Sequence, residues 1–209
     1  MRAIVTGLVI AVATASAALA QVGKSQGVVD MNTVAEKELA GMPNITPAIA
    51  HAIVAKRPFA SITELNALLV SQGLTPQQAT ELYPRAFVPI NLNTATPEEI
   101  LLVPGAGRRM THEFAEYRPW RNWAQFDREI GKYVGAEATA KLAQYCFIPM
   151  NANTASDTDL LTIPGADQAL VQKIKAGRPY KSSADLEQAL ANGSSASEAK
   201  RVARFLTVE

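Results

Sequence analysis

Apolar side chains recur along this chain at the spacing of short helices. A first apolar run lies at Ile100 to Leu102, and a second set at the interval of a helical face comprises Met110, Phe114 and Tyr117. A third set, also on one helical face, comprises Trp123, Phe126 and Ile130. Beyond the first 20 residues, no stretch of four or more residues shows convincing strand alternation. The pattern therefore predicts an all-α fold built from short helices.

Matched residues divide the chain into three units. Asn-Thr pairs begin at Asn32, Asn93 and Asn153, at steps of 61 and 60 residues. Each pair is followed at the same offset by a proline, namely Pro43, Pro104 and Pro164, and later by an Arg-Pro-aromatic triplet, namely Arg57-Pro58-Phe59, Arg118-Pro119-Trp120 and Arg178-Pro179-Tyr180. Such self-similarity is the signature of a repeat protein. We predict three tandem domains over residues 28–90, 91–150 and 151–209, called here the first, second and third unit, each with four or five short helices.

Helix starts are clearest in the second unit. Thr96 stands as an N-cap before Pro97, and Glu99 completes a capping box. Ser156 begins a similar sequence in the third unit, whereas the first has Ala35 at the cap position, which predicts a less well-defined start.

A proline and a small turn separate the first two helices of each unit. In the second unit the turn is Gly105-Ala106-Gly107, which leads into a helix from Arg108 to about Arg118. The first unit has Asn44-Ile45-Thr46-Pro47 here, and the third has Gly165-Ala166-Asp167. A second glycine turn is predicted before the last helix of each unit, at Gly73, Gly135 and Gly193.

These motifs carry a family resemblance. Asn91-Leu92-Asn93-Thr94-Ala95 followed by Pro104-Gly105-Ala106-Gly107 resembles the helix-hairpin-helix module of the ComEA family, the DNA receptors of bacterial DNA uptake. The resemblance covers residues 28–209 in three copies, although that family usually carries one module, often behind a membrane anchor. It implies helix-hairpin-helix domains, here three in tandem, and DNA as the partner. Because no serine, cysteine or histidine constellation suggests a nucleophile, we expect neither an enzymatic activity nor a cofactor.

The hairpin chemistry that this resemblance implies is electrostatic. One glycine adopts positive φ, and the next lets a phosphate approach the free N–H groups at the start of the following helix, which carries little sequence information. The second unit offers both glycines and two cations, so it is the best candidate. The candidate DNA-binding residues are Gly105, Ala106, Gly107, Arg108 and Arg109, with Gly165, Ala166 and Lys173 from the third unit. The alternative for every hairpin is that it only turns the chain.

The first and third hairpins are weaker candidates. Thr46 crowds the approach and Pro47 lacks an N–H donor, while Asp167 places a carboxylate where a phosphate would lie. Lys173, Lys175 and Arg178 compensate for that carboxylate only in part.

Several other residues have two interpretations. Arg57, Arg118 and Arg178 could contact phosphate, but bonding to the last carbonyls of the preceding helix is favoured. Trp120 and Trp123 could stack on bases, but core packing is favoured. His51 and His112 are interpreted as residues of the helix surface. With two histidines and one cysteine, the sequence shows no recognised metal-ligand spacing.

The first 20 residues differ from the rest. A single positive charge at Arg2 and an apolar run ending at Ala18-Leu19-Ala20 predict a cleavable secretory signal peptide, with an uncleaved membrane anchor as the alternative. Residues 21–27 are predicted to be a short linker. The chain is therefore expected in the periplasm or outside a bacterial cell, with no membrane span after cleavage. Cys146 is interpreted as a buried thiol, and an intermolecular disulfide is the alternative.

Charge leaves the function open. The three units carry 4 basic against 5 acidic residues, 7 against 7, and 7 against 7, so a DNA site must be local. The first hypothesis is an exported, non-sequence-specific DNA-binding protein, serving DNA uptake, whose modules gain avidity. The alternative is a periplasmic protein-interaction scaffold that has lost DNA binding, because fold does not determine function.

Overall fold

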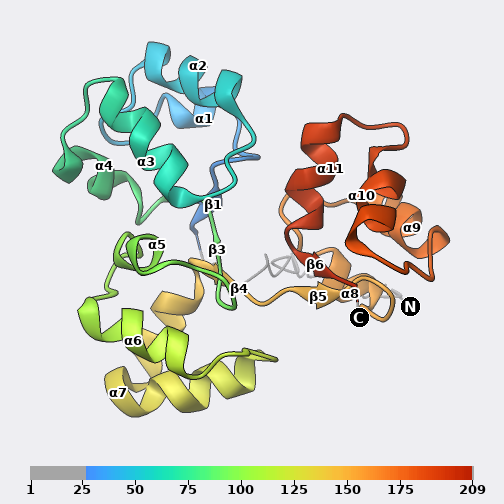
Figure 1. Ribbon diagram of the computed structural model, residues 1–209. Helices are drawn as coiled ribbons and strands as arrows, with labels where there is room; N and C mark the ends of the chain where they lie inside the picture. The colour runs from blue at the N-terminus through green and yellow to red at the C-terminus, as the bar shows by residue number, and fades with distance from the viewer. Residues whose placement is uncertain (1–26, 209) are drawn as a thin grey trace, which may run out of the picture.

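The structure is a computed structural model that describes residues 27–208. The predicted signal peptide and most of the predicted linker lie outside the described residues. In chain order the elements are β1 (Val29–Asp30), α1 (Glu36–Leu39), α2 (Pro47–Lys56), α3 (Ile62–Ser71), α4 (Pro76–Leu82), β2 (Ala86–Phe87), β3 (Ile90–Asn91), α5 (Pro97–Leu101), α6 (Arg108–Glu116), α7 (Trp123–Ala143), β4 (Cys146–Phe147), β5 (Met150–Asn151), α8 (Asp157–Leu160), α9 (Gln168–Ala176), α10 (Ser183–Ala191), α11 (Ala196–Ala203) and β6 (Leu206–Thr207). The all-α prediction is confirmed (Figure 1).

Three very short parallel strand pairs join the start of each unit to its end. β1 pairs with β2, β3 with β4, and β5 with β6. The sequence did not predict these pairs, because two residues are too few to show a strand period. Their register aligns the ends of the units, since Phe147 of β4 and Thr207 of β6 occupy equivalent positions.

The predicted caps and turns are present. Thr96 and Ser156 both form capping boxes, whereas Ala35 makes no side-chain cap. Gly73, Gly135 and Gly193 all have positive φ, as predicted. In the second unit Gly135 lies inside α7, where φ of 78° breaks the helix into two segments.

The repeated asparagine explains why the Asn-Thr and Arg-Pro-aromatic motifs recur together. Asn93 accepts a hydrogen bond from Trp120 N through Oδ1 (2.6 Å) and donates from Nδ2 to Trp120 O (3.0 Å). Asn32 makes the same pair of bonds to Phe59, and Asn153 makes it to Tyr180. We call this paired contact the asparagine clamp. It fixes each buried aromatic residue, 27 residues away, against the beginning of its unit.

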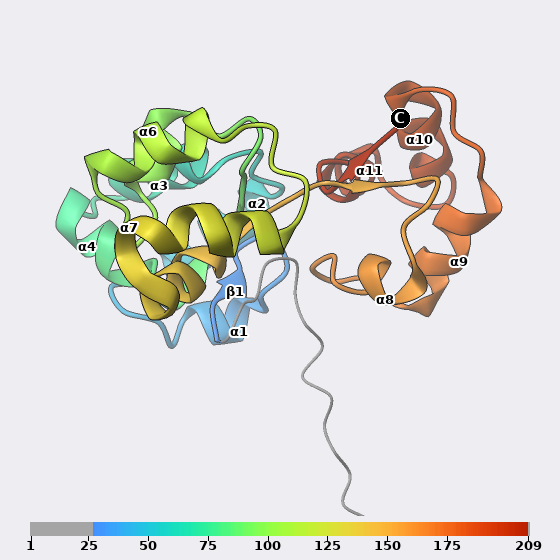
Figure 2. The ribbon, with the colours of Figure 1, turned by 90° about the horizontal axis from the view of Figure 1, so that it is seen from below.

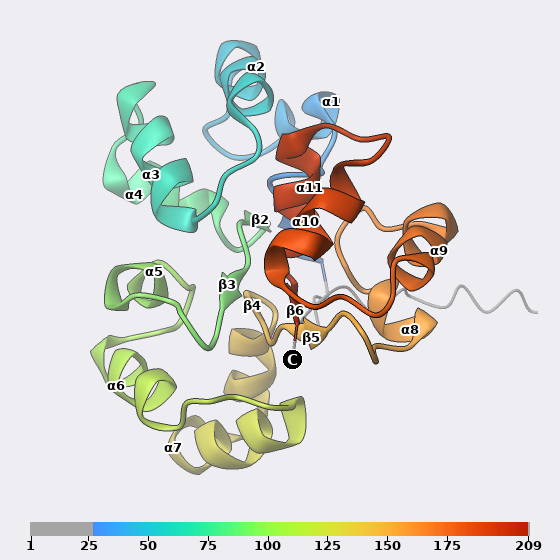
Figure 3. The same cartoon turned by 45° about the vertical axis from the view of Figure 1, so that its right-hand side comes forward.

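The cores of the first two units are continuous. One buried apolar cluster runs from Val28 to Cys146, and a second fills the third unit up to Leu206 and includes Phe147 from the end of the second unit. Figures 1 and 2 show the first two units stacked and the third beside them, and Figure 3 brings the third unit forward. Arg204 ties the third unit to the others, since its Nη2 donates to Pro89 O at 2.8 Å and its guanidinium lies 5.4 Å from the centre of the Phe147 ring.

Candidate functional site

The hairpin of the second unit presents bare backbone to solvent. Gly105 has φ of 84°, as predicted, and no atom lies within 4 Å of the position that a Cβ would occupy. Gly107 is the N-cap of α6 and also has open space at its Cβ position. Because glycine has no side chain to accept from the first N–H groups of α6, an external acceptor can take that place.

Two arginines follow this open helix start. Arg108 and Arg109 occupy the first turn of α6 and are both exposed. The Arg109 guanidinium lies 4.3 Å from the centre of the Tyr133 ring, and its Nε is 3.4 Å from Oε1 of Glu113, a buried residue. The hydroxyl of Tyr133 shares a 2.8 Å hydrogen bond with that of Tyr117, which raises the pKa of Tyr133 and keeps the phenol neutral. The Arg109 guanidinium is thereby held one turn along α6, against Glu113 and the Tyr133 ring of α7.

The hairpin of the first unit is closed by its own side chains. Asn44 adopts a positive φ of 61°, and its Nδ2 donates to Glu81 Oε2 (2.9 Å) and to Gln78 O (3.2 Å) of α4. Thr46 Oγ1 caps α2 by accepting from Ile49 N at 3.3 Å. The position that a phosphate would use is therefore already occupied by an acceptor of the protein.

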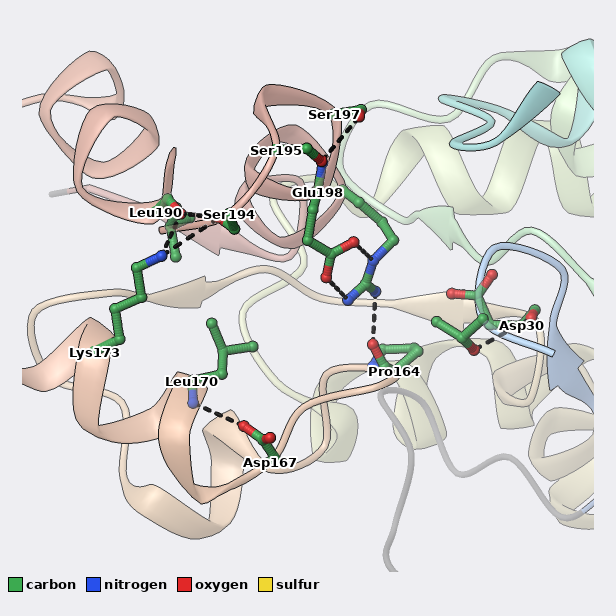
Figure 4. Close-up of polar contacts among 12 residues, drawn as sticks. Asp30, Pro164, Asp167, Leu170, Lys173, Leu190, Ser194, Ser195, Ser197 and Glu198 are labelled. Atoms are coloured by element: carbon green, nitrogen blue, oxygen red, sulfur yellow. Dashed lines mark hydrogen bonds and ion pairs between the residues drawn. The ribbon is translucent and has the colours of Figure 1, made fainter. Parts of the chain in front are cut away.

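The hairpin of the third unit is also occupied. Asp167 Oδ1 accepts from Leu170 N at 2.8 Å, which caps α9 with a carboxylate (Figure 4). Arg201, which is 5% exposed, donates from Nη1 to Pro164 O at 2.6 Å. A Cβ at Gly165 would lie 3.2 Å from Cγ2 of Thr33 in the first unit, so the first unit crowds this turn.

The cations expected to compensate for Asp167 have other partners. Lys173 Nζ donates to Leu190 O and lies 3.4 Å from Ser194 Oγ (Figure 4). Lys175 forms an ion pair with Asp157 at 2.7 Å. The structure thus brings Gly105, Ala106, Gly107, Arg108 and Arg109 together in the second unit and places Gly165, Ala166 and Lys173 in a separate, internally bonded hairpin.

Two of the three recurrent arginines bond carbonyls, but not those that the sequence indicated. Nε and Nη2 of the third, Arg57, are buried and have no hydrogen-bond partner within residues 27–208. Arg118 donates from Nε to Leu92 O (2.8 Å) and from Nη2 to Ala95 O (2.6 Å), and Arg178 makes the matching bonds to Ala152 and Ala155. These carbonyls precede the first helix of the unit, so the prediction of bonds to the last carbonyls of the preceding helix was wrong. The repeat of these arginines along the sequence does not show which distant loop lies against each guanidinium in the fold.

Other predicted roles are resolved by burial. Trp120 is 1% exposed and donates from Nε1 to Phe114 O at 2.8 Å, and Trp123 packs partly buried against the core, so the core interpretation is confirmed. The side chains of His51 and His112 are 77% and 74% exposed, as predicted for helix-surface residues. Cys146 is a buried free thiol, and burial raises its pKa.

One cation was missed in the sequence. Lys141 lines a groove of about 460 Å³ that begins at Pro104 and Gly105 and continues along the second segment of α7. Glu81 and Arg201 occupy the matching position in the other units, where each bonds its own hairpin. Lys141 instead pairs with Glu137 at the surface (2.7 Å), an exposed pair of small energetic weight. Alignment of the three units could have identified Lys141, since the equivalent position lies beside the hairpin in every unit.

No helix within residues 27–208 is long and apolar enough to cross a bilayer. No group of three or more His, Cys, Asp or Glu residues in that range is arranged to hold a metal ion.

Comparison with known proteins gives one match, to part of the chain. No curated protein and no solved structure matches this chain. A family model described as the helix-hairpin-helix motif matches residues 24–84, which covers most of the first unit. The match agrees with the fold found there, in which α1 and α2 flank the turn at Asn44. Residues 24–84 therefore carry a helix-hairpin-helix motif, a motif consistent with non-specific DNA binding.

Proposed function

We propose that this chain is an exported, non-sequence-specific DNA-binding protein of the ComEA type, built from three helix-hairpin-helix modules and without enzymatic activity. The observation that carries the proposal is the difference among the three hairpins. The second alone combines a helix start without a side-chain cap, two open glycines and two exposed arginines, among the hairpins of residues 27–208. A phosphate would supply the missing acceptor and meet both guanidinium groups.

The occupied hairpins define the role of the other units. Because the first and third hairpins are satisfied by Thr46 and Asp167, we infer that they support the fold and that one hairpin makes the DNA contact. This differs from the expectation of avidity from three binding modules.

Fluorescence anisotropy with a labelled duplex of arbitrary sequence, across a salt series, tests the proposal. The affinity of the wild-type chain should fall steeply as salt rises, because phosphate binding releases counterions. Arg108→Ala with Arg109→Ala should weaken binding by about tenfold or more, since hydrogen bonds to charged groups contribute about 1.5–3 kcal/mol each. Lys37→Ala with Arg85→Ala removes the same charge from exposed positions of the first unit and serves as the matched control.

A second variant separates binding from folding. Gly107→Asp should cap α6 as Asp167 caps α9, leaving stability unchanged or slightly higher while placing a carboxylate at the phosphate position. Loss of DNA binding by a folded Gly107→Asp variant supports the proposal. Equal binding by wild type and this variant, or no salt-dependent binding at all, contradicts it.

The scaffold function is favoured by a different observation, the closure of two hairpins by the protein's own side chains. A protein partner recovered from nuclease-treated periplasmic extract, together with no DNA binding by the purified chain, would establish that alternative.

A further inference from the structure

The groove beside the second hairpin is lined mostly by apolar residues and is open to solvent. It has a volume of about 460 Å³ and lies between the turn at Gly105 and the second segment of α7. None of its lining residues is acidic, and most are apolar: Pro104, Gly105, Val134, Ala138, Lys141, Leu142, Gln144 and Tyr145. Val134 is 37% exposed, which is unusual for a large apolar side chain of this protein. The groove is therefore an apolar surface open to solvent with one cation and one amide among its lining residues.

The other units do not keep an equivalent groove open to an anion. In the third unit the corresponding groove, of about 360 Å³, is lined by the carboxylates of Asp167 and Glu198, and Lys173 bonds across it to Leu190 O. In the first unit Asn44 bonds the hairpin directly to α4. The apolar groove with a cationic rim thus accompanies the one hairpin whose helix start is uncapped.

The position of the groove points to its occupant. Gly105 belongs both to the groove and to the hairpin, so a phosphate held at Gly107 and Arg108 would lie next to the groove entrance. A nucleotide carries a flat, largely apolar base next to its phosphate, with hydrogen-bonding groups on the edge of the base. The groove offers apolar walls for the faces of a base and the Gln144 amide for its edge. Lys141 can meet an adjoining phosphate by exchanging its exposed partner Glu137 for it, because such a surface ion pair has a small energetic weight.

We propose that this groove accepts one unpaired base, so that the second unit binds single-stranded nucleic acid in preference to duplex. The inference rests on the proposed function and specifies its substrate class. In a duplex the faces of each base are covered by stacked neighbours, and a base must leave the stack before it enters a pocket. A duplex can therefore use only the phosphate contacts of the hairpin.

The test compares three labelled probes by fluorescence anisotropy at one salt concentration. They are an oligothymidylate of about eight nucleotides, within the range of single-strand site sizes, an abasic deoxyribose-phosphate oligomer of the same length, and a duplex. The wild-type chain should bind oligothymidylate at least about fivefold more tightly than the abasic oligomer, the lower end expected for contacts to one base. Equal affinity for these two probes overturns the inference.

Two variants locate the base contact. Ala138→Phe should fill the groove, and Val134→Ser should remove part of its apolar wall; both should lower affinity for oligothymidylate toward that for the abasic oligomer. Val70→Ser changes another exposed valine, 44% exposed in the first unit, and should have no effect. A base preference that survives in folded Val134→Ser and Ala138→Phe variants overturns the inference.

The outcomes separate this inference from the proposed function. If all three probes bind equally and binding is lost in the Arg108→Ala, Arg109→Ala variant, phosphate binding stands and the base site is rejected. If none of the probes binds, the proposed function is rejected and the base site with it.

Discussion

The asparagine clamp of the second unit gives a sharp prediction for stability. Asn93→Ala removes the 2.6 Å bond from Trp120 N and the 3.0 Å bond to Trp120 O. Trp120 is 1% exposed, so its backbone groups lose their partners in a poorly hydrated position. The clamp also holds the Trp120 ring against Phe126, at 5.3 Å between ring centres, so loosening it disturbs the core.

The expected magnitude follows from the two lost bonds. Each contributes about 0.5–1.5 kcal/mol net, and an unsatisfied buried group costs about 1–3 kcal/mol. Asn93 itself is only partly buried, which allows water to replace part of the loss. We therefore expect Asn93→Ala to lower the free energy of unfolding by about 2–4 kcal/mol. Asn32 is 7% exposed, so Asn32→Ala should cost more than Asn93→Ala.

Urea denaturation followed by tryptophan fluorescence measures this effect in the correct unit, because both tryptophans of the chain, Trp120 and Trp123, lie there. With a slope of about 1–3 kcal/mol per M urea, the midpoint should fall by about 1–2 M. Thr94→Ala changes the exposed neighbour of the clamp and should leave the midpoint unchanged. An Asn93→Ala midpoint equal to that of Thr94→Ala would refute the reasoning, since the two bonds would then contribute nothing.

Three further predictions concern the backbone conformation of Gly105, the charge of Asp30 and the reactivity of the Cys146 thiol. Gly105→Ala should destabilise the chain by about 1 kcal/mol because its φ of 84° disfavours a Cβ, while Gly107→Ala, at φ of −91°, should cost less; urea denaturation compares them. Burial raises the pKa of Asp30 above its ordinary value of 3.8, so the folded state binds the proton more tightly than the unfolded state. The free energy of unfolding should therefore fall as pH rises through the folded-state pKa. Measured between pH 4 and 8, it should change less with pH for Asp30→Asn than for the wild type. Cys146 should react with an aromatic disulfide reagent only when urea unfolds the chain, and fast labelling of the native protein would contradict its burial.

Local sequence determined the start and end of most helices. Thr96 and Glu99 form a capping box from their own spacing, and Asn44, Gly105 and Gly165 adopt positive φ because these residue types tolerate it. The all-α class also followed from the helical apolar period. These features depend on interactions within a few residues, which a sequence shows directly.

Only the tertiary structure decided how the repeated residues are used. Three kinds of contact join residues that lie 23 to 57 positions apart along the chain: the strand pairs, the asparagine clamp and the bonds of Arg118. The periodicity of a single helix or strand does not predict contacts at such separations. The same holds for the hairpins. Their sequences suggested which one is open, but the contacts of Arg201, Lys173 and Thr33 that occupy the third, and the apolar groove beside the second, arise from packing between distant segments. Sequence determined the conformation of each turn and the residue that caps the following helix, and packing determined the groove beside the second turn and the contacts that crowd the third.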